Sequence, residues 1–271
     1  MSGFVDAVGV THQPVAAAPR IVSLVPSITE LLCDLGLSAS LAGRTGFCIH
    51  PRETLRAVPK VGGTKDVDLE HVRALAPTHV IVNIDENTRE TAEALAAFVP
   101  HVIVTHPLGP LDNPPLFRLL GGIFGRTAQA ESLCRDFELA LPAVRAHRDV
   151  ERVLYLIWRE PWMTVSRDTY IARMLALYGW QTWPADASVR YPALSLADSQ
   201  GHVDRVLLSS EPYPFRERHL DEVRAALPGI PVTLIDGEMV SWYGSRAIRG
   251  LRYLDHYTAD AVRTRISVHA D

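Results

Sequence analysis

The sequence has few cysteines, no excess of positive charge and no long hydrophobic run. Its three cysteines, Cys33, Cys48 and Cys134, are widely spaced in 271 residues, and an odd number of this kind does not form a disulfide framework. Lysine and arginine total 27 against 31 aspartates and glutamates, for a net charge of −4. That balance argues against a general nucleic-acid binder. No apolar stretch approaches the roughly 18 residues of a membrane helix, so we expect no membrane insertion.

The first twenty residues also lack the pattern of a secretory leader, which has a basic start followed by about 7–15 apolar residues. The first arginine or lysine is Arg20, and Asp6, Thr11 and His12 interrupt the apolar positions. We therefore expect residues 1–19 to form a flexible tail. Together with the unpaired cysteines, this favours a cytoplasmic protein, with a periplasmic location as the alternative if a leader has been removed.

What the sequence does contain is a regular alternation of strand and helix patterns. Short runs rich in valine, isoleucine and leucine predict buried strands, and helix-forming segments separate them. The strands are expected at 20–25, 41–46, 79–83, 101–106, 152–158, 204–210 and 231–236. This order is typical of parallel β-α-β units.

Two helix starts carry capping patterns. Ser27 and Glu30 have the S-x-x-E spacing of a capping box, in which each side chain bonds the backbone at the other's position. Asp68 precedes the apolar pattern of the next helix and is placed to cap it. Gly36 and Pro77 are expected to end these two helices.

The pattern also indicates how the chain is divided. Residues 127–148 have helix-forming composition with no strand signal, and the segments on either side repeat the same order of strand, loop and helix. We therefore predict an α/β fold of two Rossmann-like lobes, with a lobe at 20–125, a long connecting helix at 126–149 and a second lobe at 150–271. Ligands of parallel α/β sheets bind beyond the carboxyl ends of the strands, so a cleft between the lobes is the expected site.

Three stretches resemble a known family: "RIVSLVPSITELL", "VPKVGGTKDVDLEHVRALAPTHVIV" and "IPVTLIDGEMVSWYGSRAIRGLRYL". They are similar to the binding proteins of the vitamin B12 and iron-siderophore class, the helical-backbone metal receptors. The resemblance spans about residues 20–260. It implies two α/β lobes bridged by a rigid helix, no catalysis, and a metal chelate such as cobalamin, haem or an iron-siderophore as ligand.

The resemblance also implies a partner, an ABC-type permease that is met by one surface glutamate on each lobe. Glu70 occupies the first of these positions. The second is expected near residue 197, where this chain has Ala197 followed by Asp198. Aspartate is shorter and is displaced by one residue, so the second docking position departs from the family pattern.

Aromatic and charged residues gather after the predicted strands. Aromatic faces suit a large planar ligand because they bury much area at a low entropy cost, carboxylates can bind a metal or hydrogen-bond a corrinoid periphery, and basic residues can neutralise an anionic chelate. Tyr191 is included because the resemblance places an aromatic residue there. The predicted ligand-binding residues are Arg44, Phe47, Cys48, His50, Lys65, Glu86, Trp158, Glu160, Trp162, Tyr191, Glu211, Tyr213, Trp242, Tyr243 and Arg246. For each of them, loop packing, helix capping or surface ion pairing is the competing explanation.

The loop "RTGFCIHPRE" supports an alternative function. Cys48 and His50 could ligate zinc or ferrous iron if the loop turns tightly, with Glu86, Glu160 or Glu211 completing the site. The chain would then be a cytoplasmic metal-ion-binding protein or metalloenzyme on the same scaffold. Buried packing of Cys48 is the competing explanation. No G-x-S-x-G, P-loop or G-x-G-x-x-G pattern is present, so the sequence predicts that the chain is not an enzyme.

Overall fold

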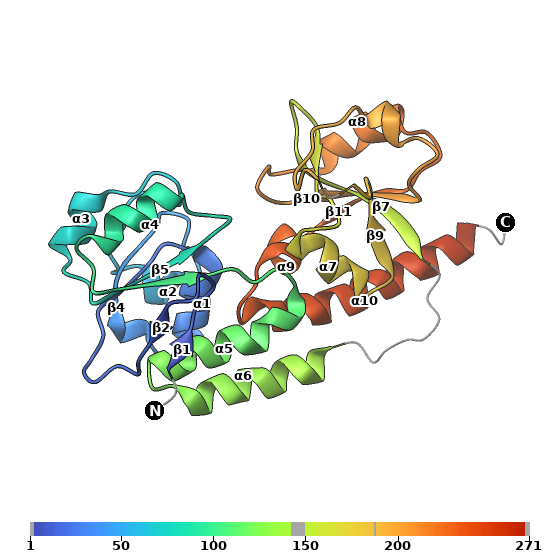
Figure 1. The fold of residues 1–271 in the computed structure, drawn as a ribbon. Helices are drawn as coiled ribbons and strands as arrows, with labels where there is room; N and C mark the ends of the chain where they lie inside the picture. The colour runs from blue at the N-terminus through green and yellow to red at the C-terminus, as the bar shows by residue number, and fades with distance from the viewer. Residues whose placement is uncertain (1–2, 142–149, 187, 269–271) are drawn as a thin grey trace. The chain divides into compact units, whose positions relative to one another are not determined.

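The computed structural model of the chain describes residues 3–141, 150–186 and 188–268. The chain divides into two compact units (Figure 1). Unit 1 comprises Met1–Pro107, Leu111–Leu139 and Tyr243–Arg246, and unit 2 comprises Leu108–Pro110, Ala140–Trp242 and Ala247–Asp271. Each unit is an α/β structure built on a sheet of mainly parallel strands, which confirms the predicted fold class.

Unit 1 contains a four-stranded parallel sheet in the order β4-β3-β5-β6. Its strands are β3 (Ile21–Ser23), β4 (Leu41–Arg44), β5 (His79–Asn83) and β6 (His101–Thr105). The helices are α1 (Pro26–Asp34), α2 (Arg52–Leu55), α3 (Leu69–Ala74), α4 (Arg89–Ala96), α5 (Asn113–Ile123) and α6 (Thr127–Ala140), with short 3-10 turns at Ser38–Ser40 and Pro110–Asp112.

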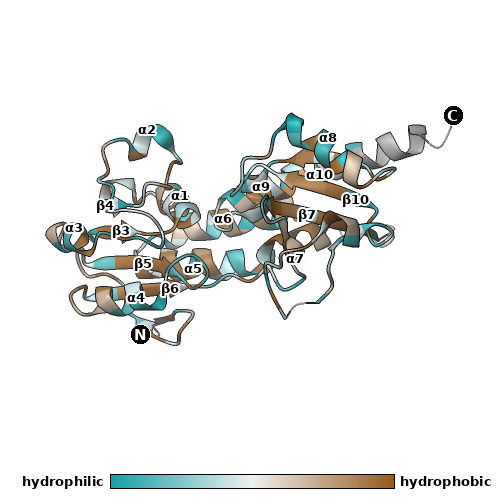
Figure 2. Cartoon of the chain, turned by 90° about the horizontal axis from the view of Figure 1, so that it is seen from above, coloured by the Kyte–Doolittle hydropathy of each residue, from teal (hydrophilic) through white to brown (hydrophobic). Residues whose placement is uncertain are grey.

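Both faces of this sheet are buried, which explains why its strands are nearly continuous apolar runs. Val80 and Val82 of β5 pack with Val72 of α3 and Leu95 of α4. Ile81 points to the opposite face, since side chains alternate along a strand, and it is fully buried as well. Covered parallel sheets of this kind keep their strand ends as the accessible polar edge. In Figure 2 the central strands are brown, whereas the outer helices carry polar teal residues.

The N-terminal residues differ from the expected flexible tail. β1 (Phe4–Val5) and β2 (Thr11–His12) form an antiparallel hairpin. The buried carboxylate of Asp6 accepts hydrogen bonds from the backbone N–H groups of Val10 at 2.9 Å and Val104 at 3.1 Å, and pairs with His12 Nε2 at 3.1 Å. The hydrogen bond to Val104 attaches the hairpin to β6. The bonds to Val10 and His12 fix the turn of the hairpin, although Asp6 and His12 interrupt the apolar pattern of the sequence.

Unit 2 contains a sheet in the order β11-β10-β7-β8, and β9 also pairs with β7. Its strands are β7 (Glu151–Trp158), β8 (Met163–Thr164), β9 (Trp180–Thr182), β10 (Arg205–Ser209) and β11 (Val232–Ile235). Only β8 runs antiparallel to its neighbour within this described sheet. The helices are α7 (Tyr170–Ala176), α8 (Glu217–Ala226), α9 (Gly237–Ser241) and α10 (Arg246–Val268), with a 3-10 turn at Leu196–Ser199.

One of the two predicted caps is confirmed and the other is wrong. Asp68 accepts a hydrogen bond from the backbone N–H of His71 at 2.9 Å and caps α3. Ser27 is not an N-cap, because α1 already begins at Pro26. Proline suits the first helical position, where its missing N–H costs nothing. Glu30 consequently does not cap α1. It pairs with Arg246, another residue of unit 1.

The predicted connecting helix is described only in part. α6 covers Thr127–Ala140, while residues 142–149 lie outside the described residues. None of the helices in the described part of the chain combines the length and the apolar character that crossing a bilayer requires.

Candidate functional site

The carboxyl ends of β3, β4, β5 and β6 form a polar edge in unit 1. The turn after β5 is fixed by Asn87, whose Oδ1 accepts from the backbone N–H of Asn83 at 2.9 Å and whose Nδ2 donates to the Thr64 carbonyl at 2.7 Å. Asn83 Oδ1 in turn accepts from the Asp85 N–H at 2.8 Å. These bonds hold the loop that carries Asp85 and Glu86.

Arg44 organises the loop after β4. The side chain is buried, its Nε donates to the carbonyl of Leu55 at 3.1 Å, and its Nη1 donates to the carbonyls of Thr45 at 3.1 Å and Cys48 at 3.0 Å. The guanidinium thus closes the predicted Cys48–His50 loop from inside. These three hydrogen bonds from Arg44 fix the shape of the loop.

Cys48 lies fully buried beneath this loop. Its Sγ accepts a hydrogen bond from Thr29 Oγ1 at 3.0 Å and lies 3.1 Å from Thr45 Oγ1. Burial raises the pKa of the Cys48 thiol, although the two threonine hydroxyls favour the thiolate. His50 lies on the same loop and is half-buried.

A metal site at this loop also lacks its further ligands. Within residues 3–141, 150–186 and 188–268, no group of three or more histidine, cysteine, aspartate or glutamate residues is arranged to hold a metal ion. Structural and catalytic zinc sites need at least three protein ligands. The geometry therefore favours packing for Cys48 over the expected metal ligation.

Glu86 is held by a residue from the far end of the sequence. Tyr243 donates its phenolic O–H to Glu86 Oε1. Burial, and next the Glu86 carboxylate, raise the pKa of Tyr243, so the phenol stays protonated and remains a donor. Both residues belong to unit 1, because Tyr243–Arg246 is a short segment of that unit.

We call Tyr243–Arg246 the inserted segment. Gly244 donates its N–H to Asn113 Oδ1 at 2.6 Å and has φ +79°, where a Cβ would lie 3.1 Å from the Ser27 carbonyl oxygen. Arg246 forms a bidentate ion pair with Glu30, at 2.7 Å and 3.0 Å. Both partners of this pair are buried. Arg246 was expected to face a ligand, whereas in the structure it pairs with Glu30.

The corresponding edge of unit 2 contains half-buried carboxylates, among them Glu211 after β10 and Asp236 after β11. Glu211 follows β10, and its Oε1 accepts from Ser241 Oγ at 2.6 Å and from Trp242 Nε1 at 2.9 Å. Burial raises the pKa of the Glu211 carboxyl, although these two donors favour its charged form. Below it, buried Tyr155 donates to Ser209 Oγ at 2.9 Å. Trp242 is buried, with its indole N–H used by Glu211 rather than offered to a ligand.

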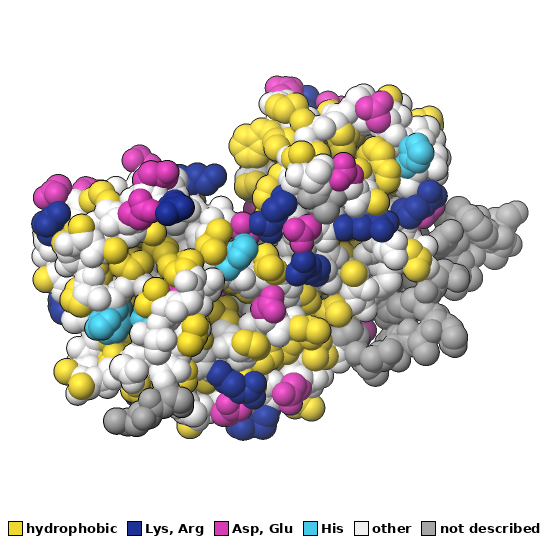
Figure 3. Space-filling view, in the orientation of Figure 1, with side chains coloured by type: hydrophobic (Ala, Val, Ile, Leu, Met, Phe, Trp, Pro, Cys, Tyr) yellow, Lys and Arg dark blue, Asp and Glu magenta, His cyan; other side chains and the backbone are white. Residues whose placement is uncertain are grey.

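Aromatic rings gather beside this carboxylate. Trp158 ends β7 and meets Tyr213 edge to face, with ring centroids 5.7 Å apart. Trp162 stacks on Phe215 at 5.9 Å and packs against the core of unit 2. The side chain of Trp158 nevertheless remains 41% exposed. Figure 3 shows hydrophobic side chains gathered over the loops of this unit.

The remaining predicted residues lie on the surface. Phe47 and Lys65 are exposed in unit 1, and Glu160 is exposed in unit 2, where it has φ +64° and pairs with Arg159 at 2.8 Å. Tyr191 is 41% exposed, with the Arg190 guanidinium 5.7 Å from its ring centroid.

The two predicted docking residues are exposed too. Glu70 lies in the first turn of α3, with 85% of its side chain accessible and Arg73 Nε at 3.6 Å. Asp198 lies in the 3-10 turn Leu196–Ser199. Each is placed to meet a partner, and the docking role of both stays a prediction.

Sequence reasoning missed three residues that shape these edges: Glu30, Asn113 and Ser241. Their partners are 216, 131 and 30 residues away along the chain, so no local pattern reveals them. Asn87 is different, since the spacing of Asn83 and Asn87 is typical of side chains that bond nearby backbone in turns and could have been recognised.

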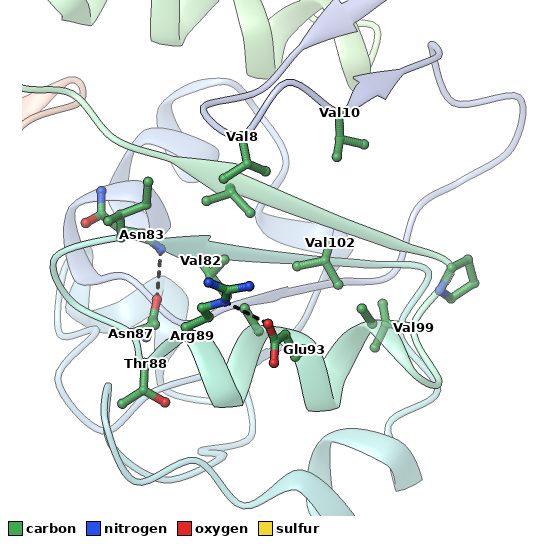
Figure 4. Close-up of a pocket in the computed structure, with 15 residues that line it drawn as sticks. Val8, Val10, Val82, Asn83, Asn87, Thr88, Arg89, Glu93, Val99 and Val102 are labelled. Atoms are coloured by element: carbon green, nitrogen blue, oxygen red, sulfur yellow. Dashed lines mark hydrogen bonds and ion pairs between the residues drawn. The ribbon is translucent and has the colours of Figure 1, made fainter.

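Unit 1 also contains an apolar pocket of about 600 Å³ away from the predicted residues (Figure 4). Val8 and Val10 of the hairpin line one side, and α4 lines the other. Its charged residues, Arg89 and Glu93, pair with each other at 2.7 Å. The two charged side chains of this pocket therefore neutralise each other.

Comparison with known proteins agrees with the fold. The sequence profile of the family described as periplasmic binding protein matches residues 21–197. The vitamin B12-binding protein of Pectobacterium atrosepticum is 24% identical over 188 residues, which cover 66% of this chain and 67% of that protein.

Two solved structures share the architecture. The periplasmic vitamin B12 binding protein of Vibrio cholerae has a TM-score of 0.77 and 18% identity, and the match covers 90% of this chain and 98% of that one. The periplasmic haem-binding protein of Roseiflexus sp. RS-1 has a TM-score of 0.74 and 24% identity, covering 87% of this chain and 95% of that one. All of these are binding proteins, in agreement with the expectation that the chain is not an enzyme.

These matches correct the expected location and leave the alternative function without support. A cytoplasmic protein was expected, but the family and its solved relatives are periplasmic. The expectation rested on a missing leader pattern and unpaired cysteines, and neither feature determines where a protein resides. None of the relatives named here is a metal-ion-binding protein or a metalloenzyme. Because the profile match extends over well more than half of the sequence, the chain belongs to the periplasmic binding protein family.

Proposed function

We propose that the chain binds a metal chelate of the cobalamin, haem or iron-siderophore class and presents it to an ABC-type permease. The named relatives bind vitamin B12 or haem, and a structurally similar protein from Listeria monocytogenes is an ABC transporter substrate-binding protein. Chelates of this class are large and partly planar. Their recognition calls for aromatic surface together with a few fixed polar groups.

The observation that carries this proposal is the exposed indole of Trp158 at the carboxyl end of β7. Trp158 is 41% exposed, and the ring of Tyr213 meets it edge to face. Glu211, fixed by Ser241 and Trp242, supplies a polar group just after β10, the strand that pairs with β7. An aromatic face with an oriented carboxylate next to it suits a ring system with amide or metal-bound donors at its periphery.

Titration of cyanocobalamin, haemin and a ferric siderophore into the protein tests the proposal, followed by ligand absorbance and tryptophan fluorescence. Trp158→Ala should weaken binding of the preferred chelate by about 1–3 kcal/mol through lost area and ring geometry. Leu139→Ala removes another exposed apolar side chain, on α6 in unit 1, and should leave affinity unchanged. If no chelate binds the wild-type protein, or if both variants bind equally well, the proposal is wrong.

The permease part of the proposal rests on the exposed side chains of Glu70 and Asp198. Arginine pockets on a permease would recognise such carboxylates. Glu70→Arg should therefore lower recovery of the loaded protein on permease-containing vesicles while leaving chelate affinity unchanged. Equal recovery of variant and wild type would remove Glu70 from the docking surface.

A further inference from the structure

The loop that follows β4 encloses a second pocket of unit 1, with a volume of about 760 Å³. Residues from the loop 44–50 and from α2 line it, together with Arg56 and Lys60. Its lining includes the cations Arg44, Arg52, Arg56 and Lys60 against one carboxylate, Glu53. Four positive charges against one negative charge leave an excess of three at neutral pH, without counting the half-buried His50 that also lines the pocket.

Arg44 is the fixed element of this pocket. Its residue exposure is 7%, and its Nε and Nη1 are used by the carbonyl oxygens of Leu55, Thr45 and Cys48. Carbonyl oxygens orient a guanidinium but do not neutralise it. Within the described residues its Nη2 makes no hydrogen bond and no carboxylate pairs with it. Buried charges are usually paired, so this one calls for a counter-charge.

The other cations of the pocket lack acidic partners as well. In the part of the chain that the structure describes, Arg52, Arg56 and Lys60 form no ion pair. Exposed arginines elsewhere do, for example Arg118 with Glu131 at 2.7 Å and Arg152 with Asp204 at 3.0 Å. Unneutralised charge of one sign in a concave, partly enclosed site attracts ions of the opposite sign.

We propose that this pocket binds the oxyanion group of a small molecule, a carboxylate or a phosphate. A guanidinium that is already oriented loses little freedom on binding, and its planar donors match both kinds of oxyanion. Arg56 and Lys60 supply mobile charges around it, and the volume is in the range of small-molecule sites. The apolar pocket of Figure 4 offers no comparable charge, since Arg89 and Glu93 neutralise each other there.

Isothermal titration of the full chain with metal-free pyrophosphate and citrate at low ionic strength tests this site. The variant Arg56→Gln/Lys60→Gln removes two exposed charges and leaves Arg44 and the loop intact. It should weaken the preferred anion by roughly tenfold, as expected for the loss of two charges a few ångströms from the ligand. The control Arg73→Gln/Arg89→Gln removes the same charge from other surfaces of unit 1 and should change affinity by less than about twofold.

The two probes distinguish the sources of the oxyanion. Tighter binding of pyrophosphate assigns the pocket to phosphate compounds, and tighter binding of citrate assigns it to carboxylates. A site formed around Arg44 should also raise the melting temperature of the wild type on anion addition, and this shift should be lost in Arg56→Gln/Lys60→Gln. Absence of saturable binding of both anions, or equal losses in the two double variants, would overturn the proposal.

This proposal stands apart from chelate binding, because the probes contain no metal and no ring system. Cobalamin and haemin titrations of the wild-type chain, set beside its anion titrations, complete the test. Chelate binding with no anion binding would disprove the oxyanion site and keep the proposed function. Anion binding without any chelate binding would do the reverse.

Discussion

Each unit holds a half-buried or buried glutamate in a different way, on α1 in unit 1 and after β10 in unit 2. Glu30 of unit 1 is buried and neutralised by a bidentate ion pair with Arg246. Glu211 of unit 2 is held only by neutral donors, Ser241 and Trp242, with no ion pair in the described part of the chain. The first arrangement fixes a charged group within the fold. In the second arrangement burial makes ionisation of the Glu211 carboxyl costly. Its protonation state therefore depends on the groups around it.

This difference suggests a division of tasks between the two edges. An ion pair that is satisfied within the unit contributes to the fold and has little left to offer a ligand. A carboxylate oriented by hydroxyl and indole donors has remaining acceptor capacity, because one of its oxygens accepts both bonds. We therefore expect mutations at Glu30 to affect stability and mutations at Glu211 to affect protonation.

The largest effect is expected from Glu30→Gln, which removes the carboxylate from the buried bidentate pair with Arg246. The free energy of unfolding should fall by about 3–5 kcal/mol. Urea denaturation followed by circular dichroism measures this loss. Glu93→Gln breaks the exposed pair with Arg89 and should cost less than about 0.5 kcal/mol. Similar losses in the two variants would show that the Glu30 pair is not a structural element.

A smaller loss is expected from Tyr243→Phe, which removes the donor to Glu86 while keeping the ring. A hydrogen bond to a charged group contributes about 1.5–3 kcal/mol, and the same denaturation experiment detects its loss. Tyr191→Phe removes the hydroxyl of a residue that is 41% exposed and serves as the comparison, with a smaller loss of stability expected. An unchanged stability of Tyr243→Phe would mean that Glu86 does not hold the inserted segment.

The smallest effect, with the opposite sign, is expected from Glu211→Gln. The folded-state pKa of Glu211 is raised, so over the pH range between its unfolded and folded pKa values the folded protein retains a proton that the unfolded chain releases. Stability therefore decreases as the pH rises through this range. Glutamine keeps an acceptor for Ser241 and Trp242 without ionising, and should increase stability at pH 8 by on the order of 1 kcal/mol.

Thermal unfolding at pH 4 and pH 8 measures this change, and the wild type and Glu211→Gln should converge at the lower pH. Glu160→Gln changes an exposed carboxyl of the same unit and should follow the wild type at both pH values. A Glu211→Gln variant that is less stable at pH 8 than the wild type would show that the charged carboxylate is preferred in the fold.

The sequence was sufficient for the parallel sheets but not for the interactions at their edges. β5 was predicted at its observed bounds, because a strand buried on both faces is a compact apolar run. The N-terminal hairpin was missed because its strands are two residues long and Asp6 breaks their pattern. The S-x-x-E spacing misled because Pro26 had already begun α1. Arg246 was assigned to a ligand because its partner Glu30 is 216 residues away, and only the tertiary fold brings them together.

The inserted segment has a consequence for how the chain matures. Unit 1 uses Tyr243, Gly244 and Arg246 to engage Glu86, Asn113 and Glu30, yet almost all of its other residues precede position 140. During synthesis the first unit lacks the inserted segment, and with it the Arg246 partner of Glu30, until residue 246 has been added. A gene fragment ending at residue 139 should therefore yield a destabilised unit 1. Unit 1 completes its fold only when the segment Tyr243–Arg246 has been synthesised.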